Sequence, residues 1–84
     1  MPDVSREAFA KALHEGSEDE RNQRWPEAID GYSRLMSTLR TRSDPESRAM
    51  RAIALMRTGN AWMEMRRWDE ARAALADALH EAKG

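Results

Sequence analysis

The side chains that most often carry catalysis or bind metal ions are scarce in this chain of 84 residues. It has two histidines, His14 and His80, and no cysteine. His14 and Glu18 have the i,i+4 spacing that could hold a metal ion on one helix face, but a solvated helix surface explains such a pair equally well. The glycines are isolated from one another, so no glycine-rich phosphate loop is present. We therefore predict no enzymatic activity, no cofactor and no metal site.

Arginines form a second group with possible chemistry. The formal net charge is −1, yet residues 31–67 carry 8 basic and 3 acidic side chains. Arg48, Arg51 and Arg57 follow one predicted helix and could contact an anionic ligand or a nucleic acid. A solvated arginine face or an internal acidic partner explains them as well. Because the total charge is nearly neutral and no nucleic-acid motif is present, an anionic-ligand or nucleic-acid module remains the alternative hypothesis.

A stripe of methionines is the third group. Met56, Asn60 and Met63 recur at steps of four and three residues, which places them on one face of a predicted helix. Methionine side chains adapt their shape readily and are common at protein-binding surfaces. The stripe could therefore bind a partner, or it could be buried against a further helix or a second copy of the chain.

Four helices are expected to position these groups, and each has a start signal. The first begins near Asp3 or Ser5, either of which could cap it. Pro26 suits the first turn of the second helix, and Asp44 followed by Pro45 suits the start of the third.

Apolar residues at helical spacing support all four helices. The second should end at about 40–42, the third should cover about 45–66, and the fourth about 69–82. The stretch 17–24 has no apolar residue, so the first half of the first repeat is the weakest match to the repeat. The end of the first helix is expected either to fray or to lean on something absent from this chain.

The chain contains an internal repeat. The segment 16–28 aligns with 59–71 without a gap, and Arg-Trp precedes a helix that opens with Glu-Ala in both. The offset is 43 residues, from Ala28 to Ala71, and Tyr32 then corresponds to Leu75. Gly59 lies inside a helix, where glycine costs about 1 kcal/mol relative to alanine, so we expect a neighbouring helix to pass close to its backbone.

The second copy of this pattern resembles the tetratricopeptide repeat, whose motif runs W-x2-L-G-x2-Y and then A-x3-F. Gly59, Trp62 and Ala71 match in kind and Leu75 fills the later aromatic position, whereas Thr58 and the missing terminal proline depart from the motif. The resemblance covers about residues 5–83 in two repeats, about 5–42 and about 45–83, of which the second matches better. The offset of 43 residues exceeds the family's 34.

The resemblance implies an all-α fold of two antiparallel helix-turn-helix hairpins, a fragment of an α-solenoid, that binds other proteins. The implied inner groove contains Leu13 and Ser17 from the first repeat and Met56, Asn60 and Met63 from the second. Family members that clamp C-terminal carboxylates use lysine and asparagine in the first repeat's groove. Because Leu13 and Ser17 stand there instead, that function is not expected here.

Length and composition set the remaining expectations. The chain should form one domain over 1–84 with a limited core. Repeat proteins generally need about three units, so we expect a homodimer or a place in a larger assembly. The N-terminus has no secretory signal pattern, no apolar run could span a membrane, and the absence of cysteine fits the cytoplasm. The preference for arginine over lysine suggests a bacterial source.

Overall fold

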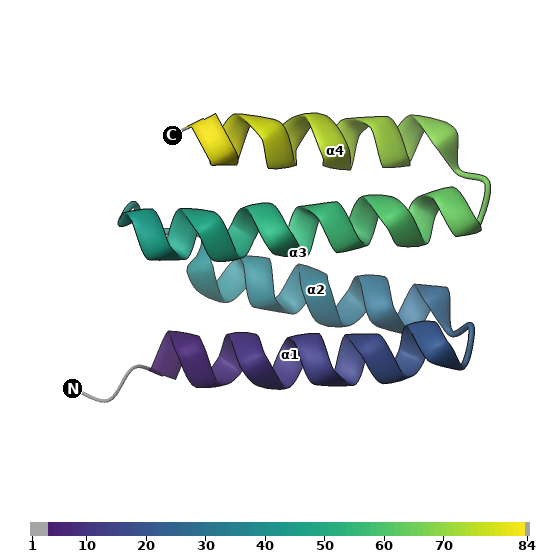
Figure 1. Cartoon of the computed structure of the whole chain (residues 1–84), viewed down its shortest axis with the longest axis horizontal. Coiled ribbons are helices and arrows are strands. Elements are labelled where there is room, and N and C mark those ends of the chain that lie inside the picture. The colour runs from purple at the N-terminus through teal and green to yellow at the C-terminus, as the bar shows by residue number, and fades with distance from the viewer. Residues whose placement is uncertain (1–3, 84) are drawn as a thin grey trace.

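The chain folds into four α-helices that form two hairpins. The computed structural model describes residues 4–83, with the side chains of residues 6–83, and contains no strand in that range. The helices are α1 (Val4–Arg21), α2 (Trp25–Leu39), α3 (Pro45–Glu64) and α4 (Trp68–Lys83), and consecutive helices run antiparallel (Figure 1). The predicted all-α fold of two helical hairpins is confirmed.

Helix boundaries follow the start signals in the sequence. Pro26 lies in the first turn of α2. Asp44 caps α3 because its side chain accepts a hydrogen bond from the Ser47 backbone N–H at 3.0 Å. Among the expected caps of α1, Asp3 lies outside the described residues, and Ser5 is already within the helix. The third helix ends at Glu64, slightly earlier than predicted.

The four helices lie side by side in chain order (Figure 1), in a slab whose Cα extents are 39 × 26 × 14 Å. Each helix packs against the next one, and α1 also touches α3. Within the described range α4 packs against α3 alone. The outer side of α4 therefore has no neighbour among the described residues.

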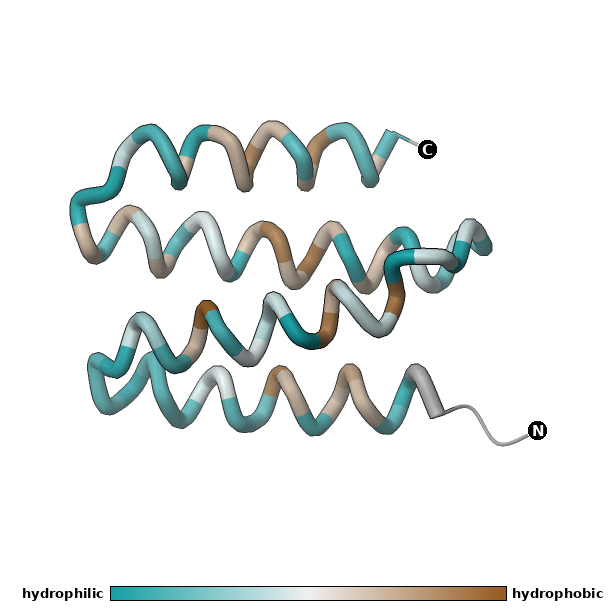
Figure 2. Tube along the Cα trace, turned by 180° about the vertical axis from the view of Figure 1, so that it is seen from behind, coloured by the Kyte–Doolittle hydropathy of each residue, from teal (hydrophilic) through white to brown (hydrophobic). Residues whose placement is uncertain are grey.

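The large core side chains are concentrated in the first three helices. Tyr32, Leu35 and Leu39 of α2 form one buried cluster with Met50 and Ala54 of α3. The apolar side of α1 packs against this cluster, whereas its C-terminal half is hydrophilic (Figure 2). The buried residues of α4 are the small ones Ala71, Ala74 and Ala78.

The internal repeat extends to the backbone of the two hairpin turns. Gln23 (φ 59°) and Arg66 (φ 61°) both adopt the left-handed conformation, 43 residues apart. Each is the C′ residue of a Schellman motif. In the first turn Gln23 N–H donates to Glu20 C=O at 3.0 Å and the next N–H to Asp19 C=O at 2.7 Å. In the second turn the same two bonds, from residues 66 and 67 to 63 and 62, are both 2.9 Å long.

Two glycines mark where the helices of each hairpin approach closely. Gly16 and Gly59 are both buried. A Cβ atom on Gly16 would lie 2.3 Å from the hydroxyl oxygen of Tyr32, and one on Gly59 would lie 2.8 Å from Cδ2 of Leu75. The close approach expected at Gly59 is confirmed, and Tyr32 and Leu75 occupy equivalent positions in the two hairpins.

Candidate functional site

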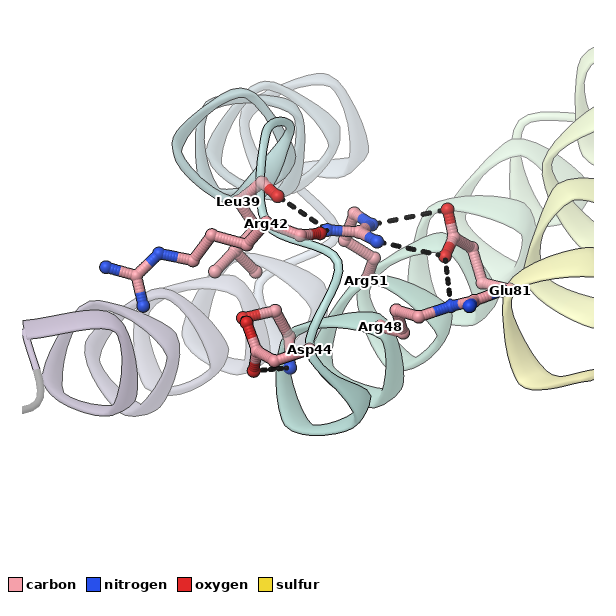
Figure 3. A network of polar contacts seen from close by, with 7 residues as sticks. Leu39, Arg42, Asp44, Arg48, Arg51 and Glu81 are labelled. Atoms are coloured by element: carbon pink, nitrogen blue, oxygen red, sulfur yellow. Dashed lines mark hydrogen bonds and ion pairs between the residues drawn. The ribbon is translucent and has the colours of Figure 1, made fainter. Parts of the chain in front are cut away.

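Arg51 joins three parts of the fold through its guanidinium group. Its Nη1 donates to the backbone carbonyls of Leu39 at 2.5 Å and Arg42 at 2.6 Å, which lie at and just after the end of α2 (Figure 3). Its Nε and Nη2 each donate to the Glu81 carboxylate of α4 at 3.2 Å. With only 12% of its side chain exposed, Arg51 satisfies helix-end carbonyls and anchors the end of α4.

Arg48 belongs to the same cluster. Its Nε lies 3.8 Å from the Glu81 carboxylate (Figure 3). The hydrogen bonds from Arg51, with the charges of both arginines, hold the pKa of Glu81 below its usual value. Two of the three candidate anion-binding arginines are thus bound to the same internal carboxylate.

Arg57, the third of these arginines, lies in a second cluster, where α3 meets the polar end of α1. Its Nη1 is 3.4 Å from the Ser17 hydroxyl oxygen and 3.7 Å from the Glu20 carboxylate. Glu20 in turn accepts a hydrogen bond of 2.6 Å from the hydroxyl of buried Tyr32. Burial, and then the hydrogen bond and charge of Glu20, raise the pKa of Tyr32 to about 12. All three arginines therefore have acidic partners within the chain.

This second cluster also explains how the polar half of α1 is held. The sequence offers no apolar residue in 17–24, yet α1 remains helical to Arg21. Ser17 and Glu20 bond to side chains of α2 and α3 instead of contributing apolar contacts. Sequence reasoning missed this cluster, because its members are 12 to 40 residues apart in the chain.

The predicted groove residues lie in two different environments. On α3, Met56 is 52% exposed, Met63 is 40% exposed and Asn60 is also exposed, so all three are accessible. On α1, Leu13 is half-buried and packs against the core cluster, and Ser17 contacts Arg57. The accessible part of the predicted groove is therefore the α3 part.

The large apolar side chains that remain exposed all lie on the second hairpin. Within the described residues they are Ile53, Met56 and Met63 of α3 and Trp68, Leu75 and Leu79 of α4. We call these six residues the hairpin face.

Two shallow grooves run along the hairpin face. One is lined by Met63, Trp68, Leu75 and Leu79, with Arg72 beside them. The other lies between the start of α3 and the end of α4, where Ile53 lines it together with small residues that include Ala49 and Ala82. Both grooves combine side chains of α3 and α4, so the exposed apolar residues of the two helices adjoin one another.

The α4 half of the hairpin face was missed by sequence reasoning, although the repeat contains a signal for it. Trp68, Leu75 and Leu79 correspond to Trp25, Tyr32 and Met36 of α2. Tyr32 is buried in the core cluster with two residues of α3, and Met36 packs against the same cluster. In α4 the equivalent positions have no helix over them in the part of the chain that the structure describes.

Other kinds of site have less support in the structure. No three histidine, aspartate or glutamate side chains in the described part of the chain could together hold a metal ion. None of the helices in that part is long and apolar enough to cross a membrane. No protein family model, curated protein or solved structure matches this chain significantly.

Proposed function

We propose that this chain is a protein–protein interaction module, built like two tetratricopeptide repeats, that binds its partner through the hairpin face. The observation that carries the proposal is the grouping of six exposed large apolar side chains on one hairpin. Soluble proteins rarely leave a contiguous apolar surface uncovered unless it binds something. Trp68 at 59% exposure and Leu79 at 58% would be costly to leave in water in a domain with so small a core.

The repeat architecture supports the same proposal. Equivalent Schellman turns, equivalent glycine contacts and a constant offset of 43 residues make the second hairpin a copy of the first. In stacked repeats each unit buries its apolar face against the next unit. The second hairpin lacks such a neighbour within residues 4–83, so its face is available to a partner. The module would act as an adaptor or assembly element without chemistry of its own.

The anionic-ligand alternative has no comparable observation in its favour. Arg51 already makes four hydrogen bonds inside the fold, and Arg48 and Arg57 each lie next to a carboxylate. A salt titration separates the two proposals, since phosphate contacts weaken steeply with salt and apolar contacts do not.

The test compares three tagged forms of the chain in affinity capture from the source organism. These are the natural sequence, Met56→Asp with Met63→Asp, and a control, Ser33→Asp with Ser37→Asp, at exposed positions of α2. We expect a protein, or a differently tagged copy of this chain, that binds the first and third forms but not the second. The purified partner should show the same pattern in calorimetric titration. Equal binding to all three forms, at equal helicity by circular dichroism, overturns the proposal.

A further inference from the structure

We propose that the partner of the hairpin face is a second copy of this chain, and that the two α3–α4 hairpins pack face to face as a four-helix bundle. The inference rests on the proposed function and names its partner. In this bundle α3 of each copy lies against α4 of the other, and neighbouring helices are antiparallel. Four observations carry it: the charge on the outer side of α1, the extent of the hairpin face, and the positions of two charged residues, Glu64 and Arg72.

The outer side of α1 excludes stacking of copies head to tail. The α3 residues Met50, Ala54, Thr58 and Ala61 are buried and correspond to Glu7, Lys11, Glu15 and Glu18 of α1, which are all exposed. Seating α1 of one copy on α4 of another, as α3 sits on α2, would bury these charged side chains on an apolar surface. Burying charges without partners is strongly unfavourable. Stacking of this kind is therefore unfavourable, and a contact that uses the same surface on both copies, as in a two-fold symmetric dimer, avoids it.

The extent of the hairpin face calls for two covering helices. A single helix placed on α4 as α3 is placed on α2 would cover Trp68, Leu75 and Leu79. It would leave Ile53 exposed, because the equivalent residue in the first hairpin, Ala10, is exposed although α3 is present. A second α3–α4 hairpin presents two parallel rows of apolar side chains and covers both rows of the first.

Charged residues at the edge of the face select one of the two symmetric arrangements. Glu64 follows Asn60 by four residues and Ile53 by eleven, so it lies at the α3 edge of the face. Arg72 lines the groove beside Leu75 and Leu79 of α4. Both residues lie near the turn between the helices, and neither has an ion pair with any described residue.

With the two-fold axis along the helices, both turns lie at the same end of the bundle. Glu64 of each copy then faces Arg72 of the other, and two complementary pairs form. With the axis across the helices, α3 would lie on α3 and bring Glu64 towards Glu46, which is already paired with Arg6, and α4 would lie on α4 and bring Arg72 towards Lys83. Like charges in contact are unfavourable, so the first arrangement is selected.

The experiment is sedimentation equilibrium of the full chain over a range from micromolar to hundreds of micromolar, at low salt. We expect a species of twice 9.6 kDa. Glu64→Arg and Arg72→Glu should each weaken dimerisation about tenfold or more, because each places two like-charge pairs in the interface. The control is Asp77→Arg, which has the same charge change as Glu64→Arg but lies on a side of α4 other than the one that carries the hairpin face. This variant should dimerise like the natural chain.

Mixing the two weakened variants is the specific test of the arrangement. A heterodimer of Glu64→Arg with Arg72→Glu has both pairs complementary again, so it should form more tightly than either variant alone. Circular dichroism at equal concentration checks that each variant is folded. If the natural chain dimerises but the mixed variants bind no more tightly than either variant alone, the arrangement is overturned. A 9.6 kDa species of the natural chain at hundreds of micromolar overturns the inference entirely. In that second case the proposed function still stands if capture finds a different protein that the Met56→Asp, Met63→Asp variant no longer binds. If the double variant binds that protein as the natural chain does, both the inference and the proposed function fail.

Discussion

At the scale of single residues, long polar side chains join helices in addition to the apolar contacts between them. Arg51 bonds to the end of α2, to the loop after it and to α4, and no other described side chain joins those three parts. Because the guanidinium is nearly buried, removing it leaves the Arg42 carbonyl without this donor, the Leu39 carbonyl with only the Arg42 backbone N–H, and Glu81 with only Arg48. Such groups cost free energy unless water replaces the lost bonds.

The first prediction follows from this position. Arg51→Met should lower the free energy of unfolding by about 2–4 kcal/mol, the range for breaking a buried charged network by removing one member. Arg51→Lys should recover little of the loss, because an ammonium group cannot reproduce the bidentate contact with Glu81. Urea unfolding followed by circular dichroism measures both. The effect should shrink at acid pH. Because folding lowers the pKa of Glu81, the resulting stability is present above the usual pKa of glutamate and is lost as pH falls through the lower pKa of the folded state. A change below about 0.5 kcal/mol at neutral pH would contradict the network.

Tyr32 supplies the second prediction, as it is the only tyrosine in the chain. Its pKa should be about 12 in the folded protein, against about 10 in the unfolded chain. The folded state holds the proton more tightly, so the resulting stability is fully present below pH 10 and is lost as pH rises from there towards 12. Absorbance of the tyrosinate ion gives the pKa directly.

Glu20→Gln is the control for this titration. It should lower the pKa of Tyr32 while leaving part of the increase, because burial is the largest cause and remains. Tyr32→Phe should remove this alkaline loss of stability. A titration at the ordinary tyrosine pKa in the natural chain would mean that the hydroxyl is not held as described.

At the scale of elements, the two hairpin turns place non-glycine residues where glycine is favoured. Gln23 and Arg66 have positive φ, a region that costs an L-residue with a side chain roughly 1 kcal/mol. The third prediction is that Gln23→Gly and Arg66→Gly each stabilise the protein by about 0.5–1 kcal/mol. The control is Arg24→Gly, one residue later at φ −94°, which should destabilise it because glycine only adds freedom to the unfolded chain there. Thermal unfolding of the three variants measures these changes in stability. Stabilisation by all three glycines would contradict the turn assignment.

The glycines inside helices give the fourth prediction. Gly16→Ala should destabilise by about 1–3 kcal/mol, since its Cβ would overlap the ring and hydroxyl of buried Tyr32. Gly31→Ala, in α2, meets no atom within 4 Å and should stabilise by up to about 1 kcal/mol through helix propensity. Urea titration of the two variants beside the natural chain measures this difference in sign. Two changes of the same sign would show that the helices of the first hairpin are not packed as described.

Features that depend on local sequence could be predicted, and those that depend on tertiary contact could not. The cap at Asp44, the first-turn proline Pro26, the four helices and the gapless repeat are visible as spacing over a few residues. Close packing was predicted at Gly59 and is present, but glycine inside a helix does not show it alone, since an added Cβ on Gly31 of α2 would have no atom within 4 Å. The bonds from Arg51 to Glu81 and from Tyr32 to Glu20 join residues whose separation in the chain carries no pattern. The apolar stripe of α4 was visible as spacing, but only the fold shows that none of the four described helices covers its outer part.

At the scale of the whole molecule, the two hairpins have the same backbone plan but unequal cores. The first hairpin buries Tyr32, Leu35 and Leu39 and is covered on one side by α3. The second buries alanines between α3 and α4 and has six large apolar residues exposed. Since apolar burial is the main stabilising term, most of the stability of a single copy should reside in α1, α2 and α3.

This inequality leads to the last prediction, on hydrogen exchange in the Met56→Asp, Met63→Asp variant, in which the hairpin face is disabled. Backbone amides of Ala71, Ala74 and Ala78 in α4 should exchange at least about tenfold faster than those of Tyr32, Leu35 and Leu39 in α2, a difference of about 1.4 kcal/mol in local opening. Helix propensity alone predicts the reverse order, because α4 is rich in alanine, the strongest helix former. Exchange at equal rates in both helices would show that the chain unfolds as one unit and that α4 does not depend on a partner. In the natural chain, α4 should become more protected as the protein concentration rises, because only the covered hairpin face supplies the apolar burial that α4 lacks on its own.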